Sequence, residues 1–594
     1  MGAASSPRQP RAAAELCTRR SGRRLEGSRS VWIQQADPLG SIGLSALAAA
    51  IPLVFLFWAL AVKRLKGHVA GPLTALVASV VAVVVFRMPA TLAVASTLHG
   101  AAYGLFPIGW IVIAAVFLYR ITVETGQFHT IRDSIASLTS DRRLQALLIA
   151  FSFGAFLEGA AGFGTPVAIS AAMLAGLGFE PLYAAGLCLI ANTAPVAFGA
   201  IGTPIVVAGQ VTGLDPMLIS KMVGRQLPLL SLIVPFWLVF TMSGRKGVRE
   251  VWPAALVSGG SFAVAQWWTS NYLGPLLPDI ISSLVSIVCL VAFVRVWQPA
   301  RTFRFDGEAG HRDPSDAPRT PRGEGDPTAR STRDGAAATT APGASSAGAL
   351  VYAWSPFLVL TVLVGLWGIR PVKAALDAVS FAVPFPLIHN AVVLPASGKP
   401  LAALFTFNWL SATGTVILIS ALVSLAIARV RPATALALFS GTLASLAAPL
   451  LTIASVLGLA YIGNSSGMTT AMGTALASTG ALFPIFSPVL GWLGVFMTGS
   501  DTSSNAIFGK LQVVSAESTG VSPILAVAAN SSGGVTGKMI SPQSIAVACA
   551  ATGQVGNEPG LFRFTLKHSL LLLAVVALIT WLQATVLQWM IPLA

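Results

Sequence analysis

The stretch AFLEGAAGFGTPVA, residues 155–168, places one carboxylate, Glu158, among small and apolar residues. Three glycines and Pro166 follow this acid within eight residues. A charged side chain at the centre of a bilayer costs roughly 2.5–3.5 kcal/mol, and Gly and Pro weaken or interrupt a helix. A helix that only crossed the membrane would need none of these residues. The stretch therefore predicts a broken helix that carries a functional acid inside a membrane.

The composition of the whole chain is that of a membrane protein. Of its 594 residues, 55% are hydrophobic and only 10% are charged, whereas about a quarter of the residues in soluble domains are charged. Apolar runs of about twenty residues can each cross a bilayer. The fold class predicted is an all-α polytopic membrane protein with about 12–14 transmembrane helices. The apolar runs lie at roughly 42–62, 68–86, 90–118, 143–157, 183–208, 227–243, 251–270, 279–297, 351–369, 410–428, 433–460, 481–498, 521–530 with 539–553, and 568–591.

The net charge of +15 does not require a nucleic-acid partner. Basic residues concentrate in tails and short loops, such as KRLKGH (63–68), GRKGVRE (244–250) and RVRP (429–432). Cytoplasmic loops of membrane proteins carry this excess of Lys and Arg. The four cysteines form neither a CxxC pair nor a zinc-binding spacing. We therefore expect a lipid bilayer and a small molecule as partners, and no cofactor or metal.

Changes in composition divide the chain into four parts. We expect a basic, disordered N-terminal extension at 1–36, a first membrane half at 37–298 and a second at 350–594. Residues 299–349 between the halves are rich in Pro, Gly, Ala, Thr and charge, without apolar periodicity, and so predict a disordered linker. Its arginines favour the cytoplasmic side.

The N-terminal extension conflicts with the orientation of the first helix. The basic loop at 63–68 predicts that this helix ends in the cytoplasm, so the seven arginines of residues 1–30 would lie outside. The positive-inside rule disfavours that arrangement. We therefore expect translation to begin later, near Val31.

The two halves contain similar interrupted stretches. FLEGAAGFGTPVA (156–168) and ANTAPVAFGAIGTPI (191–205) in the first half correspond to FMTGSDTSSNAIFG (496–509) and AANSSGGVTGKMISPQSI (528–545) in the second. Glu158 and Asp501 are 343 residues apart, and Asn192 and Asn530 are 338 apart. Matching interruptions in two halves indicate internally repeated halves with broken or re-entrant helices, and they are the best sequence pointer to a transporter's binding site.

Polar groups at these interruptions predict the site. A half-helix N-terminus carries partial positive charge and suits a carboxylate, while Ser, Thr and Asn add hydrogen bonds. The alternative is that small residues only let helices pack closely. The proton-coupling candidates are Glu158 and Asp501. The substrate-binding candidates are Gly162, Gly164, Thr165, Asn192, Thr193, Ser503, Asn505, Lys510, Asn530, Ser531, Ser532 and Lys538.

At these same residues the sequence resembles the L-lactate permease family, which also covers D-lactate and glycolate uptake. The stretches that carry the resemblance are DPLGSIGLSAL (37–47), GAFLEGAAGFGTPVAI (154–169), NTAPVAFGAIGTPI (192–205), TGSDTSSNAIFG (498–509) and NSSGGVTGKMISPQSIAVA (530–548). The resemblance implies a multi-pass protein of the bacterial plasma (inner) membrane that takes up small 2-hydroxymonocarboxylates by proton symport. It also implies, by analogy, that NTAP and NSSGG form hairpin tips facing one substrate.

The resemblance implies roles for the candidate residues. Glu158 would carry the proton, because burial favours the neutral form of a carboxyl group, and Asp501 would be its counterpart or a partner of Lys510 or Lys538. The substrate carboxylate would lie near Thr165, Asn192–Thr193 and Asn530–Ser532, with Lys538 nearby. The substrate hydroxyl would bond to a neighbouring Ser or Asn.

Two other classes of function remain as alternatives. A sodium/proton-type antiporter would use the same acids without an organic substrate, but it would have little need for Lys538. A membrane prenyl transferase would need Asp-rich DxxD motifs at the membrane face, and the one such motif, DPSD (313–316), lies in the linker. The segment SSGGVTGKM (531–539) departs from the phosphate-binding P-loop at two positions. We therefore expect a transporter and not an enzyme, with proton or sodium coupling left open.

Overall fold

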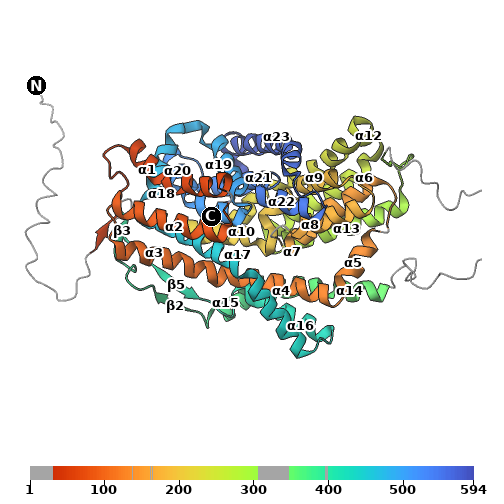
Figure 1. Ribbon diagram of the computed structural model, residues 1–594, viewed down its shortest axis with the longest axis horizontal. Helices are drawn as coiled ribbons and strands as arrows, with labels where there is room; N and C mark the ends of the chain where they lie inside the picture. Colours follow the sequence, from red (N-terminus) through yellow and green to blue (C-terminus); the bar gives the residue numbers. More distant parts are fainter. Residues whose placement is uncertain are drawn as a thin grey trace, which may run out of the picture.

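The computed structural model describes residues 31–63, 65–136, 138–160, 162, 165–305, 347–394 and 399–593. Helices make up most of this part of the chain and pack side by side through the whole molecule (Figure 1). The labels η1 to η3 denote short π-helices, and η4, η6 and η7 denote short 3-10 helices. The N-terminal elements are β1 Trp32–Ile33, α1 Ile42–Phe57, η1 Trp58–Val62, α2 Gly67–Val84, α3 Ala90–Tyr103, η2 Gly104–Gly109, α4 Trp110–Glu124, α5 Gln127–Ala136, α6 Arg142–Gln145, η3 Ala146–Phe153, α7 Gly154–Ala160, α8 Thr165–Gly176, α9 Pro181–Ala191, η4 Val196–Phe198, α10 Gly199–Thr212, α11 Pro216–Val223, α12 Leu227–Tyr272 and α13 Pro278–Val296.

The C-terminal part adds ten α-helices, two short 3-10 helices and a few short strands among the described residues. They are α14 Ala347–Gly368, α15 Arg370–Asp377, β2 Phe381–Pro384, β3 Val392–Leu394, β4 Lys399–Pro400, β5 Leu404–Phe407, α16 Thr413–Ile427, α17 Pro432–Ser466, α18 Met468–Leu476, η6 Ala477–Leu482, α19 Phe483–Thr498, α20 Asp501–Thr519, α21 Pro523–Lys538, α22 Pro542–Ala551, α23 Glu558–Thr585 and η7 Gln588–Met590. The strands form two small sheets, β1-β3-β4 and β2-β5, in which β2 runs antiparallel to β5 with Phe381 opposite Phe407.

The helix count is lower than the sequence predicts. Within the described residues, ten helices are long and apolar enough to cross a membrane, or eleven if Pro181–Ala191 and Val196–Thr212, bent by 68°, count as one span. The continuous helical stretch Pro216–Tyr272 contains two of the predicted apolar runs, which are separated only by backbone kinks at Gly244 and Val251. The prediction of an all-α polytopic membrane protein is confirmed. The lower number arises because this measure counts Pro216–Tyr272 once and excludes the shorter apolar helix Thr413–Ile427.

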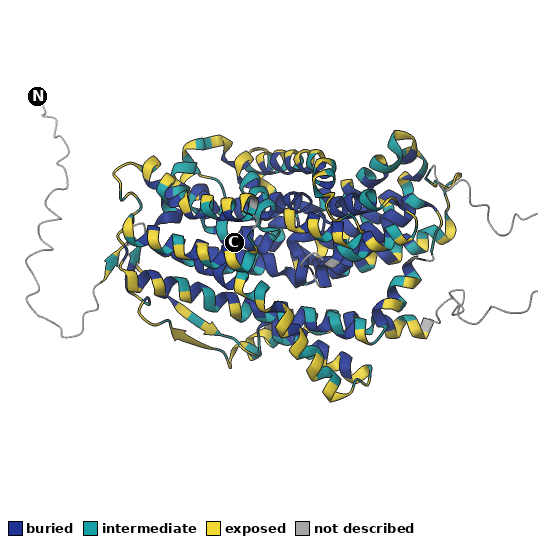
Figure 2. Cartoon of the chain, viewed as in Figure 1, coloured by how far each residue is buried: buried dark blue, intermediate teal, exposed yellow. Residues whose placement is uncertain are grey.

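The helix that carries Glu158 lies at the centre of the molecule. In the apolar 18-residue segment of Arg142–Ala160 every residue is buried. In the corresponding segments of the other nine spans, between 28% and 56% of the residues are buried. Figure 2 shows the same contrast, with buried residues through the middle and exposed ones around the rim. This span therefore contacts protein on all sides, the position in which a membrane protein can keep a polar group away from lipid.

Residues 31–36, which the sequence analysis assigns to a disordered extension, belong to the described part of the chain. Trp32 and Ile33 form a strand parallel to Val392–Val393, and the side chain of Gln34 is buried and donates to the backbone oxygens of Asn464 and Ser465. An extended apolar segment completes a sheet edge at this point, so the predicted boundary at residue 36 is wrong. Residues 1–30 lie outside the described part of the chain.

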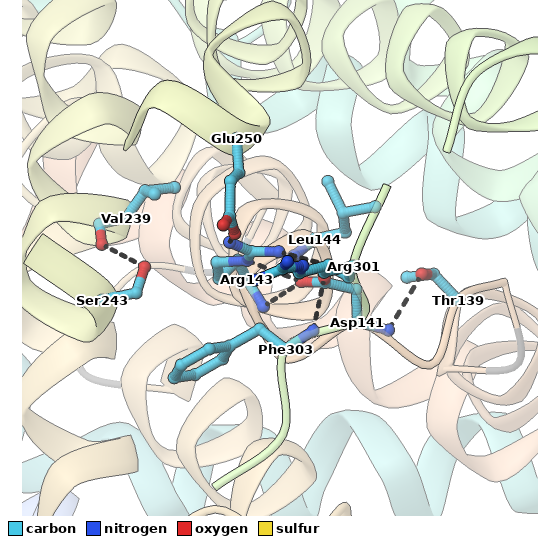
Figure 3. A network of polar contacts seen from close by, with 9 residues as sticks. All are labelled: Thr139, Asp141, Arg143, Leu144, Val239, Ser243, Glu250, Arg301 and Phe303. Carbon is cyan, nitrogen blue, oxygen red and sulfur yellow. Dashed lines mark hydrogen bonds and ion pairs between the residues drawn. The ribbon is translucent and has the colours of Figure 1, made fainter. Parts of the chain in front are cut away.

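Residues at the start of the predicted linker pack against the membrane region, as Figure 3 shows for Arg301 and Phe303, and Phe305 contacts Phe179. The guanidinium of Arg143 pairs with Asp141 at 2.8 Å and with Glu250 at 2.6 Å, and it donates to the backbone oxygen of Arg301 at 2.9 Å. The N–H of Phe303 donates to the carboxylate of Asp141. Residues 306–346 lie outside the described part, and α14 begins at Ala347.

Candidate substrate and coupling site

The first predicted helix break is present at the stretch that contains Glu158. Helix α7 ends at Ala160 and α8 begins at Thr165, with Gly162 between them at a φ of +59°. This left-handed conformation favours glycine, and a Cβ at Gly162 would also lie 3.0 Å from that of Ala200. Of the other candidates here, Gly164 and the side chain of Thr165 lie outside the described part.

The second break separates α9 from α10. The chain turns at Asn192 and Thr193, and the backbone is left-handed from Ala200 to Gly202, with φ values of 44°, 54° and 68°. Such conformations cost of order 1–3 kcal/mol for residues other than Gly and collect at functional sites. The hydroxyl of Thr193 donates to the backbone oxygen of Ile190. The amide of Asn192 is buried, and neither of its polar atoms has a partner among the described residues.

The third break, at Gly499 and Ser500, precedes α20. The side chain of Ser500 caps the helix by accepting from the N–H of Ser503, and Asp501 occupies the first turn. This break agrees with the predicted interruption in FMTGSDTSSNAIFG.

The fourth predicted break is wrong, because α21 runs without interruption from Pro523 to Lys538. The small residues in Asn530–Gly534 instead allow α19 and α21 to approach closely. A side chain on Gly533 would collide with the backbone of Pro488, and one on Gly491 with the backbone of Asn530. NSSGG is therefore a helix-packing surface and not a hairpin tip, which is the alternative that small residues offered.

Glu158 and Lys538 form a buried ion pair. The Nζ of Lys538, at the end of α21, lies 2.5 Å from Oε1 of Glu158, and the two side chains are 8% and 3% exposed. The other oxygen of Glu158, Oε2, has no partner among the described residues. Gly199 at the start of α10 leaves room beside the pair, since a Cβ there would lie 2.7 Å from Oε1.

A third charged residue at this pair, Asp279, was missed by the sequence analysis. It lies in the first turn of α13 and is 1% exposed, and neither carboxylate oxygen has a partner among the described residues. A Cβ on Gly159 would lie 2.7 Å from that of Asp279, and the charges of Glu158 and Lys538 both act on its carboxylate. The available signal was that Asp279 is the only charged residue between Glu250 and Arg295.

Asp501 anchors a second group of buried polar side chains, which brings several of the predicted residues together. Its Oδ2 accepts from the hydroxyl of Ser531 and, at 3.3 Å, from the amide of Asn505. Asn505 accepts in turn from Asn530 at 2.9 Å, and it donates to the backbone oxygen of Pro204 in α10. The oxygen Oδ1 of Asp501 has no partner among the described residues, and the charge of Lys538 reaches this carboxylate.

Two predicted residues lie away from these groups. The hydroxyl of Ser532 donates at 2.7 Å to the side chain of Gln226, the residue before α12, and so faces another part of the chain. Lys510 is half-buried, nine residues beyond Asp501, and makes no ion pair with any described residue. The sequence-based pairing of Asp501 with a lysine is therefore replaced by the pair between Glu158 and Lys538.

These features define a class of protein. Broken helices that meet around a buried ion pair, with further acids whose oxygens have no partner, are the makeup of a secondary transporter. A family model described as L-lactate permease matches residues 45–587. The chain belongs to the L-lactate permease family. This membership confirms the predictions that the protein is a multi-pass membrane transporter and that it is not an enzyme.

Two curated relatives cover almost the whole chain. The L-lactate permease of Bacillus subtilis (strain 168) is 54% identical over 94% of this chain and 100% of its own length. The glycolate permease GlcA of Escherichia coli (strain K12) is 54% identical over 94% of this chain and 99% of its own. Among solved structures, the YdaH transporter of Alcanivorax borkumensis is 15% identical, with a TM-score of 0.42 over 84% of this chain and 89% of that one. That likeness is too distant to inform the site.

Proposed function

We propose that this protein takes up L-lactate and related 2-hydroxymonocarboxylates, including D-lactate and glycolate, across the bacterial plasma membrane by proton symport. The names of the two 54% identical relatives support L-lactate and glycolate as substrates. The observation that carries the proposal is the buried pair between Lys538 and Glu158. It supplies a cation for a substrate carboxylate and an acid for the coupled proton.

The charges of Glu158 and Lys538 couple the binding of the proton to the binding of the substrate carboxylate. In the empty site, ionised Glu158 balances Lys538. A proton that binds Glu158 removes this balance, and a buried, unpaired charge is strongly unfavourable. A substrate carboxylate that binds Lys538 restores it. The empty and loaded sites then carry the same net charge, whereas a site loaded with only one of the two ligands does not.

Asp501 is the second proton-binding candidate in this scheme. Its Oδ2 is held by Ser531 and Asn505, while Oδ1 has no partner among the described residues. The charge of Lys538 reaches it, so a proton on Asp501 and the state of the ion pair influence each other.

The second candidate function is a sodium/proton-type antiporter without an organic substrate. The observation in its favour is the presence of unpartnered, buried carboxylate oxygens on Glu158, Asp279 and Asp501, which suit a cation. Lys538 argues against it, because a fixed positive charge at the same place repels a second cation.

Uptake of labelled L-lactate decides between these functions. The assay uses cells that lack their own lactate carriers and compares this protein with an empty vector, with and without a protonophore. We expect uptake above the vector that collapses with the protonophore, and competition by glycolate and D-lactate. No uptake above the vector, together with sodium-dependent proton movement in everted vesicles, would favour the antiporter.

A further inference from the structure

Asp279 is a buried acid that the proposed coupling mechanism does not use. It is 1% exposed, and both of its carboxylate oxygens lack a partner among the described residues. Buried polar groups in proteins are almost always hydrogen-bonded, and each exception calls for an explanation. A bound ligand that forms hydrogen bonds with the carboxyl group of Asp279 would provide this explanation.

The surroundings of Asp279 place it beside the proposed carboxylate site. It projects from the first turn of α13 where that helix contacts α7 at Gly159, the residue after Glu158. Glu158 in turn pairs with Lys538, so Asp279 packs against the residue next to the ion pair. This packing places Asp279 on the side of the pair where we expect the substrate.

Several other polar groups expected to hold a substrate hydroxyl already use their hydrogen-bond donors within the protein. Ser531 donates to Asp501, Asn530 donates to Asn505, and Ser532 donates to Gln226. Like Asp279, the predicted residue Asn192 is buried, and its polar atoms have no partner in the described part of the chain. Lactate and glycolate, the molecules in the relatives' names, share a hydroxyl on the carbon next to the carboxylate. This hydroxyl needs an acceptor close to the carboxylate that Lys538 binds.

We propose that Asp279 binds the 2-hydroxyl group of the substrate and so selects 2-hydroxy acids over unsubstituted carboxylates. This inference rests on the proposed function. Lys538 already balances Glu158, and an ionised Asp279 would add a negative charge that repels the substrate. Asp279 therefore keeps its own proton: its carbonyl oxygen accepts from the substrate hydroxyl, and its O–H donates.

Propionate provides the comparison, because it has the charge and nearly the size of lactate but no hydroxyl. When propionate binds, Asp279 stays buried without a partner. A site built to hydrogen-bond a hydroxyl rejects an analogue that lacks it for this reason.

The experiment measures kcat/KM for L-lactate and for propionate in proteoliposomes containing the full chain. Asp279→Leu removes the polar atoms at similar size, while Asp279→Asn keeps a neutral donor and acceptor. We expect the lactate-to-propionate ratio to fall roughly tenfold to a hundredfold in Asp279→Leu and to stay within about threefold of wild type in Asp279→Asn. Asp215→Asn, at an exposed helix start, is the matched control and should leave the ratio unchanged.

An unchanged ratio in Asp279→Leu overturns the inference. Loss of both substrates in both Asp279 variants also overturns it, because that result assigns Asp279 to proton movement. A ratio that falls in Asn192→Leu and not in Asp279→Leu transfers the role to the other unpartnered buried side chain. If wild type transports neither lactate nor glycolate, the proposed function itself fails.

A measurement on wild type alone covers the case in which Asp279→Leu does not assemble. The analogue 2-fluoropropionate has nearly the size of lactate but cannot donate a hydrogen bond from its second carbon. We expect its kcat/KM to be at least tenfold below that of lactate. Equal transport of the two compounds overturns the inference.

Discussion

The Nζ of Lys538 and Oε1 of Glu158 lie 2.5 Å apart, although the two residues are 380 positions apart in the sequence. Glu158 belongs to α7, before the linker, and Lys538 ends α21, after it. The contact joins the two membrane regions at the most deeply buried span of the molecule. The free energy of this ion pair therefore contributes both to the stability of the protein and to the proposed transport cycle.

Lys538→Gln should destabilise the protein, because it leaves the buried carboxylate of Glu158 without its partner. Removal of one member of a buried ion pair typically costs about 3–5 kcal/mol. The midpoint of thermal unfolding of the purified protein in detergent measures this cost. The double variant Glu158→Gln with Lys538→Gln removes both charges and should regain most of the lost stability. Equal destabilisation in the single and double variants would contradict a direct interaction.

Glu158→Gln should abolish uphill accumulation of lactate while retaining lactate exchange. The amide keeps the shape of the side chain but cannot carry a proton, so Lys538 remains available to substrate in every state. Accumulation is measured with an inward proton gradient, and exchange as counterflow in substrate-loaded vesicles. Normal accumulation by this variant would remove Glu158 from the proton-carrying role.

A pH gradient should drive uptake, and a membrane potential alone should not. One pH unit supplies about 1.4 kcal/mol per proton, enough for about a tenfold accumulation. A potential of 100 mV supplies about 2.3 kcal/mol for each net charge moved, but the empty and loaded sites proposed here carry the same charge. Proteoliposomes with potassium gradients and valinomycin separate the two forces. Accumulation driven by the potential would show that more than one proton accompanies each substrate.

Gly491→Ala should destabilise the protein and reduce uptake, because the new methyl group would collide with the backbone of Asn530. Overpacking of this kind costs typically about 1–3 kcal/mol, and Asn530 belongs to the amide network beside Asp501. Gly43→Ala is the matched control, since no atom lies within 4 Å of its added Cβ on exposed α1. Thermal unfolding of both variants should show a loss only for Gly491→Ala. Equal midpoints would mean that α19 and α21 are less closely packed.

Arg143→Met should destabilise the protein by about 3–5 kcal/mol, because it leaves Asp141 buried and unpaired. The side chains of Arg143 and Asp141 are 0% and 3% exposed. Arg132→Ala is the control, as its pair with Asp133 is 40% and 59% exposed, and such pairs contribute about 0–1 kcal/mol. Limited proteolysis near residue 301 should also be faster in Arg143→Met. Indistinguishable unfolding of the two variants would show that the network seen in Figure 3 contributes little.

The sequence was sufficient to predict the fold class, and it singled out Glu158, which the structure places in a buried ion pair. Apolar runs identify membrane helices, and a lone acid in such a run is costly enough to imply a use. The breaks at Gly162, Asn192 and Gly499 were also predictable, since Gly and Pro act on the local backbone. The internal repeat of the two halves stays a prediction.

The remaining features depend on packing between distant segments. No local pattern pairs Lys538 with Glu158, because that contact exists only once α7 and α21 are in place. Asp279 stands at the start of an apolar run in the sequence, and only the packing of α13 against α7 brings it next to Gly159 and the ion pair. Gly533 and Gly534 suggested a break because of their low helix propensity, whereas close contact between α19 and α21 keeps them helical.

The separation of Glu158 and Lys538 along the chain also affects how the protein is made. Synthesis proceeds at roughly 5–20 residues per second, so the lysine emerges about 20–80 s after the acid. During that interval α7 has no cationic partner from α21. The nascent first half therefore bears the cost of a carboxyl group at membrane depth until the second half arrives. The last tenth of the polypeptide completes the ion pair at its centre.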